Sequence, residues 1–219
     1  MKCFILPFLI FSVSASAESL HYTINWPSGL SLGEAMLDTS HAKAGGWDFS
    51  LDIDASIPGF AVRDHYHSQA NADLCGVTLD KKFVHGSHKN EEHTTFDQSA
   101  HTATRQTVGG GKSDISVPDC GRDALTFLQF ARNELAQGRL VPQQAVVFGA
   151  AYSVRMEFTG TQTIHIGEQK AQADRIVATL RGPSSDLTVE VFFSHDTARI
   201  PLLAKIPLAL GTFSVELVR

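Results

Sequence analysis

The sequence has little cysteine and no clustered positive charge, and each shortage excludes a class of function. It contains three cysteines and no Cys-x-x-Cys pair, so it lacks both a thiol redox motif and the common zinc spacings. Lysine and arginine number 18 against 23 aspartates and glutamates, a net charge of −5, and they are scattered. Nucleic-acid-binding proteins gather basic residues into a patch or stripe. The sequence therefore argues against a nucleic-acid partner.

Long hydrophobic runs are also missing, apart from one short stretch at the start. Lys2 precedes the apolar residues 4–11, and the small residues 15–17 follow them, which is the pattern of a signal peptide cleaved before Glu18. The stretch is too short to span a bilayer, which takes about 20 apolar residues. We therefore expect residues 1–17 to be a signal peptide and residues 18–219 to be an exported domain without a transmembrane segment.

Two cysteines, Cys75 and Cys120, remain once the predicted signal peptide and its Cys3 are removed. An even number of cysteines in an oxidising compartment indicates a disulfide rather than a reactive thiol. In the chain-entropy model, closing a loop of this length contributes about 4 kcal/mol. We predict a structural Cys75–Cys120 bridge.

Alternation of apolar and polar residues dominates the exported chain. It is clearest at 47–57, where Trp, Phe, Leu and Ile alternate with Asp and Ser, as in a half-buried strand. The same period recurs at 152–158 and 213–217. Further short candidates lie at 20–25, 31–39, 60–68, 73–79, 82–88, 92–97, 101–107, 161–168, 172–181, 187–194 and 199–206. The pattern predicts a mainly β fold, a single domain built on a large curved antiparallel sheet or incomplete barrel.

One segment has the period of a helix instead. Apolar residues recur every three or four positions over 123–137, with Asp119 as a candidate N-cap and Gly138 as a candidate C-terminal stop. We expect this helix to cover or plug the sheet. The glycines within 108–113 predict a flexible linker between the first strands and the helix.

Histidine provides the main candidates for a metal site. His65 and His67 would share one face of a strand, and His85 and His88 follow them. Zinc needs three or four ligands, and none of the recognised spacings surrounds these residues. We predict no metal site and no cofactor, with these four histidines as the candidates if a metal is bound.

Three other motifs resemble functional sites, but none has the spacing or the surroundings that such a site requires. Residues 111–113 read Gly-Lys-Ser but lack the earlier glycine of a phosphate-binding loop. Ser194, His195 and Asp196 are adjacent, so on a strand they would point to opposite faces. Asp52 and Asp54 share a face, but their alternation with apolar residues predicts a solvated one. We therefore favour a non-enzymatic role.

Three segments resemble an exported bacterial family catalogued as domain of unknown function 3108. They are Tyr-Thr-Ile-Asn-Trp at 22–26 with Gly-Glu-Ala at 33–35, the helical segment 123–132, and Phe-Ser-His-Asp at 193–196 with Arg-Ile-Pro at 199–201. The resemblance implies a mostly β protein of the Gram-negative envelope, located in the periplasm, and it implies no catalytic residues. In the last segment we predict a turn stabilised by an Asp196–Arg199 ion pair, with Pro201 holding Ile200 extended; the alternative is that these residues contact a ligand.

Three functions are compatible with these observations. The leading hypothesis is a periplasmic binding or carrier module for an apolar, lipid-like ligand, held inside the sheet or between sheet and helix. An alternative is an envelope scaffold or assembly partner that uses strand edges or the helix face. A second alternative is a histidine-based metal-binding protein or metalloenzyme.

Overall fold

The computed structural model describes residues 17–42, 45–57, 60–183, 185–209 and 211–218, so nearly all of the predicted signal peptide lies outside it. The strands are β1 (Glu18–Asn25), β2 (Ser31–His41), β3 (Trp47–Ile57), β4 (Phe60–Ala70), β5 (Gly76–His85), β6 (His88–Asp97), β7 (Thr102–Thr107), β8 (Lys112–Ser116), β9 (Arg122–Asp123), β10 (Gln144–Val147), β11 (Ala151–Ile166), β12 (Gln169–Arg181), β13 (Asp186–Ser194), β14 (Pro201–Leu208) and β15 (Gly211–Leu217). The helix α1 comprises Ala124–Ala136.

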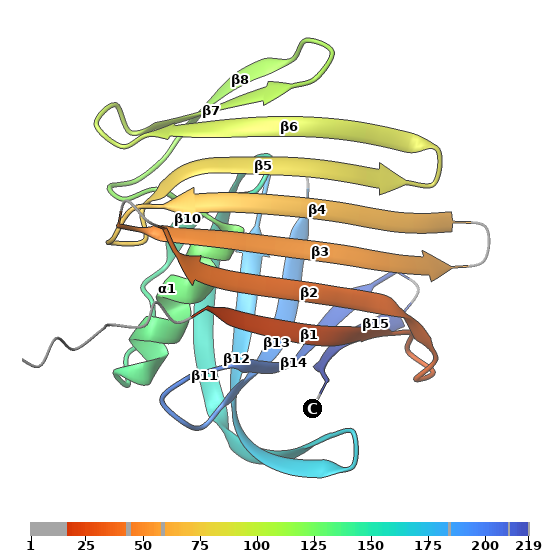
Figure 1. Ribbon diagram of the computed structural model, residues 1–219. Coiled ribbons are helices and arrows are strands. Elements are labelled where there is room, and N and C mark those ends of the chain that lie inside the picture. The colour runs from red at the N-terminus through yellow and green to blue at the C-terminus, as the bar shows by residue number, and fades with distance from the viewer. Residues whose placement is uncertain (1–16, 43–44, 58–59, 184, 210, 219) are drawn as a thin grey trace, which may run out of the picture.

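All the strands belong to one curved sheet (Figure 1). Its order is β8-β7-β6-β5-β4-β3-β2-β1-β15-β14-β13-β12-β11-β10-β9, and neighbours are antiparallel except for the parallel pair β9 and β10. The first and last strands therefore pair in the middle of the sheet, with Tyr22 opposite Leu217. The sheet is open, with β8 and β9 at its two edges. The predicted class, a mainly β fold with a large curved antiparallel sheet, is confirmed.

The predicted alternation on β3 matches the burial of its side chains. Phe49 is buried, while Asp52 and Asp54 are exposed on the opposite face. The inward residues of β1–β4 belong to the same hydrophobic core as residues of β11–β15, among them Phe192 and Leu202. Full burial of such side chains contributes about 1.5–3 kcal/mol each. This core holds together the two halves of the sheet, one formed by β1–β8 and the other by β9–β15.

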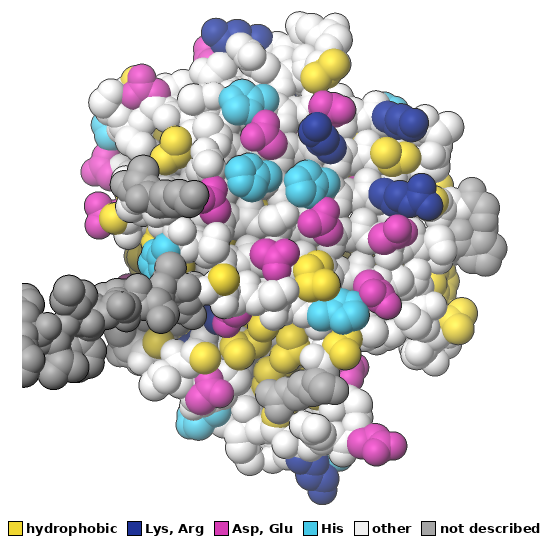
Figure 2. Space-filling model, in the orientation of Figure 1, with side chains coloured by type: hydrophobic (Ala, Val, Ile, Leu, Met, Phe, Trp, Pro, Cys, Tyr) yellow, Lys and Arg dark blue, Asp and Glu magenta, His cyan; other side chains and the backbone are white. Residues whose placement is uncertain are grey.

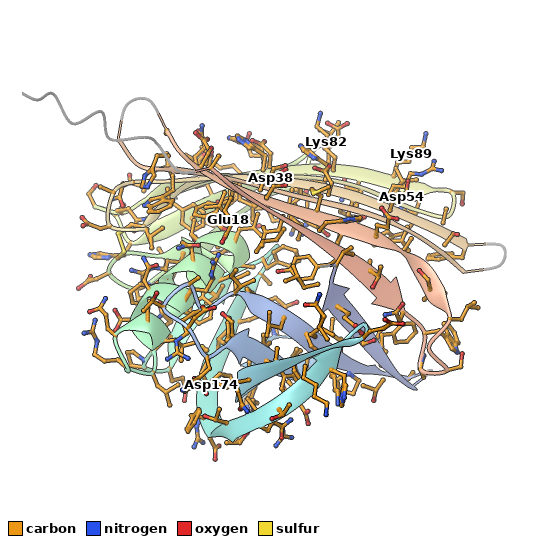
Figure 3. The ribbon with its side chains drawn as sticks, turned by 60° about the horizontal axis from the view of Figure 1, so that its bottom comes forward. Glu18, Asp38, Asp54, Lys82, Lys89 and Asp174 are labelled. Carbon is orange, nitrogen blue, oxygen red and sulfur yellow. A yellow bond between two sulfur atoms is a disulfide. The ribbon has the colours of Figure 1, made fainter. Side chains whose placement is uncertain are left out.

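Helix α1 confirms the predicted helix, with each end one residue inside the expected limits. Its N-cap is Asp123 rather than Asp119: the Asp123 carboxylate accepts hydrogen bonds from the backbone N–H groups of Leu125 (2.8 Å) and Thr126 (3.2 Å). Asp119 is exposed instead and contacts His101. The helix lies at one end of the space between the two halves of the sheet (Figure 3). Within the described residues, no helix has the length and apolar character needed to cross a membrane.

Several segments differ from the sequence prediction; for example, the strands expected at 73–79 and 82–88 are one strand, β5. The glycine-rich stretch is a hairpin turn rather than a linker: the Thr107 N–H donates to the Gly111 carbonyl (2.8 Å), and Lys112 begins β8. The short strand β10 was not predicted. Strand β11 is continuous through the two segments expected at 152–158 and 161–168, with a bulge between Phe158 and Gly160. The bulge lets one long strand change direction where the sequence pattern shows an interruption.

The predicted disulfide is confirmed, and it joins the β9 edge of the sheet to β5, which lies three strands inside the β8 edge. Cys75, before β5, is bonded to Cys120, before β9, with a Cα–Cα distance of 4.7 Å. Beside it the Gly76 N–H donates to the Gly121 carbonyl (2.9 Å). Residues of β5–β7 also share a small apolar cluster with Val147 of β10. The bridge therefore fastens a sheet that no strand ladder closes within the described residues.

Candidate functional site

The outward-pointing side chains of β1–β6 form a broad polar surface, which we call the outer face. Figure 2 shows acidic and histidine side chains spread across β2–β6 on this face, and in Figure 3 Asp38, Asp54, Lys82 and Lys89 project from it. Alternation along each strand explains the composition, because the apolar partners of these residues point into the core. The face is therefore built by regular strands rather than by loops.

The outer face contains a hollow of about 690 Å³, which lies toward the end of the face where the β3–β4 and β5–β6 hairpins turn. Charged side chains from five strands line part of it, including Glu34, Asp52, Asp54, Arg63, Lys82 and Lys89. Apolar residues line it as well, among them Met36, which is 37% exposed, Val84 and Val108. A concave, charged and solvent-open surface of this size can take a polar ligand or a protruding segment of another protein.

Five carboxylates of the outer face lie on the two adjacent strands β2 and β3, and we call them the acidic stripe. Its members are Glu34, Asp38, Asp48, Asp52 and Asp54. The strand register places Glu34 directly opposite Asp54. Like charges in a directly opposed pair destabilise a sheet. The stripe is thus a feature that folding alone would disfavour.

Side chains from the flanking strands bind the stripe. On β1, His21 Nε2 lies 2.9 Å from Glu34 Oε2; on β4, His65 Nδ1 lies 2.6 Å from Asp52 Oδ1. Also on β4, His67 Nε2 lies 3.5 Å from Asp48 Oδ1, and Arg63 Nε lies 3.5 Å from Asp54 Oδ2. Three of the five carboxylates are therefore contacted by a histidine rather than by a permanent cation.

The structure separates the four candidate metal ligands. His65 and His67 lie on the outer face with their own carboxylates, whereas His85 points inward and binds the buried Asp64 (2.9 Å). His88 lies opposite His85 across the β5–β6 hairpin, beside the ring of Phe83. Among the described residues, no three His, Cys, Asp or Glu side chains are grouped as metal ligands.

Sequence analysis missed a buried ionic cluster on the inner side of β5–β7. Glu92 binds Lys81 (3.3 Å) and Arg105, and the Lys81 ammonium lies 4.3 Å from the centre of the Phe148 ring. Burial raises the pKa of Glu92, but the two cations outweigh it and hold that pKa below its usual range. The sequence could have indicated this cluster, because the alternation along β5 and β6 places the charged residues Lys81 and Glu92 at inward positions. The cluster joins these strands to the segment after β10.

The turn between β13 and β14 is organised by Asp196, as predicted, but not through an ion pair with Arg199. The Asp196 carboxylate accepts from Ser194 Oγ (2.7 Å) and from the Ala198 N–H (3.0 Å). The Arg199 backbone has a φ of 48°, and its side chain binds Asp174 on β12 instead of Asp196. His195 Nδ1 also binds Asp174, at 2.8 Å.

Comparisons with known proteins agree with this architecture. The family model described as "Protein of unknown function (DUF3108)" matches residues 21–218. The chain belongs to this family. No curated protein matches the DUF3108 chain. Among solved structures, it is similar to a β-barrel-like protein of domain of unknown function DUF1849 from Brucella abortus, with a TM-score of 0.66 and 7% identity over 94% of this chain and 96% of that one. At this identity the likeness shows the fold alone.

In this DUF3108 chain, the segments that carried the resemblance have structural roles. A Cβ atom on Gly33 would lie 2.0 Å from the Asp54 carbonyl oxygen, so β2 and β3 could not approach with a larger residue there. The Pro201 carbonyl accepts from the Tyr22 hydroxyl (3.0 Å), which links β14 to the first strand. The family motifs therefore stabilise the frame on which the outer face is built.

Proposed function

We propose that the protein is an exported, non-enzymatic binding module that docks its partner on the outer face. The observation that carries this proposal is the opposed pair Glu34 and Asp54 at the hollow. Residues that are unfavourable for folding are expected where they serve function. The regular strands beneath would hold such a binding surface rigidly.

Export to the periplasm is part of the proposal. The pattern of residues 1–17 supports it, as does the Cys75–Cys120 disulfide, because disulfides persist in oxidising compartments.

The outer face supports docking better than the interior supports an apolar cargo. The space between the sheet halves contains the core side chains Phe49, Phe192 and Leu202, each at most 2% exposed. An apolar ligand placed there would have to displace them, and protein cores are close-packed. The hollow on the outer face is open without any rearrangement. A docking face of this kind suits an assembly partner as well as a carrier, and the mass of the bound species distinguishes the two.

The test is native mass spectrometry of tag-free mature protein purified from the periplasm of its own host. The wild type is compared with Met36→Trp, which places a bulky ring in the hollow, and with Leu208→Trp. Leu208 is a matched control, since it is a 53% exposed apolar residue on β14. We expect the wild type and Leu208→Trp to carry a bound species that Met36→Trp loses.

Two outcomes would contradict the proposal. A bound species retained by Met36→Trp would locate the binding site elsewhere, and organic extraction would show whether it is an apolar molecule from the interior. A wild-type protein that is always empty would remove the binding role.

A further inference from the structure

We infer that the acidic stripe docks a cationic protein segment, rich in lysine and arginine, and that the histidines beside the stripe weaken this docking in acid. The inference rests on the proposed function, because it names the partner of the same face. It follows from how charge is distributed over the molecule.

The outer face carries nearly all of the net charge of the exported chain. Its outward positions hold eight carboxylates, namely Glu34, Asp38, Asp48, Asp52, Asp54, Asp80, Glu91 and Asp97. They hold three permanent cations, Arg63, Lys82 and Lys89, which leaves five negative charges with histidine neutral. The whole sequence has a net charge of −5 on the same basis, and −6 without Lys2 of the predicted signal peptide. The remainder of the exported chain therefore carries a net charge of only −1, and the negative charge is concentrated on one surface.

Within the outer face, the permanent cations avoid the stripe strands. Neither β2 nor β3 contains a lysine or arginine, whereas Lys82 lies on β5 and Lys89 on β6. Arg63, on β4, contacts Asp54, which is the member of the stripe opposite Glu34. A partner that brings positive charge onto β2 and β3 would relieve the repulsion between Glu34 and Asp54. Charge complementarity thus favours a cationic occupant over an anionic one.

Histidine makes the stripe responsive to pH, because its charge changes between about pH 5 and 8. His21 faces Glu34, with Glu216 of β15 on the neighbouring strand. His65 faces Asp52 and is opposite Lys82.

The third histidine lies between two carboxylates. His67 faces Asp48 of β3 and is opposite Asp80 of β5, which also binds His93. When His21, His65 and His67 gain a proton, three of the five stripe carboxylates acquire an internal counter-charge. A cationic partner then meets a less negative surface.

The experiment measures binding of tetramethylrhodamine-labelled decalysine to the mature chain by fluorescence anisotropy. At pH 7.5 and low salt we expect saturable binding that weakens as salt is added. The double variant Asp52→Asn/Asp54→Asn should bind on the order of tenfold more weakly, since each close charge pair in water contributes about a factor of five. Asp186→Asn, which removes an exposed carboxylate from β13, is the matched control and should bind like the wild type.

The pH response is measured with the same probe, whose own charge does not change between pH 7.5 and 5.5. The wild type should lose affinity at pH 5.5, and the triple variant His21→Gln/His65→Gln/His67→Gln should lose much less. Circular dichroism checks that each variant is folded.

Several results would overturn the inference. They are binding of decaglutamate as strong as that of decalysine, an equal loss in Asp186→Asn, or an identical pH response in the triple variant. If Met36→Trp abolishes capture of the native partner but decalysine does not bind, the face docks a partner of another charge and this inference alone fails. If Met36→Trp retains capture, it is the proposed function that fails.

Discussion

Arg132 on helix α1 forms a two-pronged ion pair with Glu18, the first residue of β1. Arg132 Nη1 and Nη2 lie 2.6 and 2.9 Å from the two carboxylate oxygens, and the Arg132 side chain is only 6% exposed. The same guanidinium donates to the carbonyl oxygens of Ala198 and Arg199 in the turn before β14. One side chain therefore joins the helix, the first strand and the segment that carries the family motif.

Arg132→Ala should destabilise the protein strongly. It leaves the Glu18 carboxylate and two carbonyl groups without their donor, and breaking a buried pair costs about 3–5 kcal/mol. Urea unfolding followed by circular dichroism measures the change. Arg139→Ala is the control, because Arg139 forms a similar two-pronged pair with Glu134 on the surface beyond the same helix. Equal losses in the two variants would show that burial of the Arg132 pair is unimportant.

Asp174 should make stability fall in acid. Burial raises its pKa, but hydrogen bonds from Thr161, His195 and Arg199 outweigh burial and hold the pKa below its ordinary value. The stabilisation is therefore complete above the ordinary carboxyl pKa of about 3.9 and is lost as pH falls through the folded-state value.

The comparison is between wild type and Asp174→Asn in urea at pH 7, 5 and 3. The variant should be less stable by about 3 kcal/mol at pH 7, and the gap should narrow only below about pH 4. Asp186→Asn serves as the exposed control on β13. A gap that is unchanged at pH 3 would contradict the assignment.

Removing the Cys75–Cys120 bridge should loosen one edge of the sheet before the rest. Cys75→Ala/Cys120→Ala is expected to lower the free energy of unfolding by about 2–4 kcal/mol. Hydrogen exchange should accelerate first at the Gly76 amide, whose acceptor is the Gly121 carbonyl. Wild type treated with a reductant should behave like the double variant. Uniform acceleration across the whole sheet would mean that the bridge has no local role.

Gly33→Ala should disturb the two strands that carry the acidic stripe. The added Cβ would lie 2.0 Å from the Asp54 carbonyl oxygen and 2.5 Å from the Ala55 Cα atom, so β2 and β3 must separate. Forcing extra atoms into such a contact costs about 1–3 kcal/mol. Gly111→Ala, where the nearest atom is Thr107 Oγ1 at 3.4 Å, should change the unfolding midpoint little. Similar midpoints for the two variants would refute the steric argument.

Sequence reasoning succeeded where a local pattern determines the structure. The period of two on β3, the helical period over 123–137 and the even cysteine count each predicted a feature that the structure confirms. The helix N-cap was assigned wrongly because both Asp119 and Asp123 precede the apolar stripe. Cys120 has a φ of 57° and residues 122–123 form strand β9, so the helix begins only after Asp123, its N-cap.

The acidic stripe was beyond single-sequence reasoning for a different reason. Asp52 and Asp54 were correctly predicted to be solvated, and each acidic strand by itself is typical of an exposed face. The concentration of charge appears only when the register places Glu34 of β2 against Asp54 of β3. The contact of Arg199 with Asp174 likewise depends on pairing between β12 and β13. Both are properties of the strand arrangement rather than of any segment.

The pairing of β1 with β15 constrains the order in which the sheet can fold. The first strand to be made receives its second neighbour only from the last strand to be made, with Tyr22 opposite Leu217. Until β15 has been synthesised, one hydrogen-bonding edge of β1 is open at the centre of the unfinished sheet, and open edges invite pairing with other chains. Strand β1 therefore cannot complete its pairing in the sheet until β15 is available to fold. Native topology is completed only after elongation is almost finished.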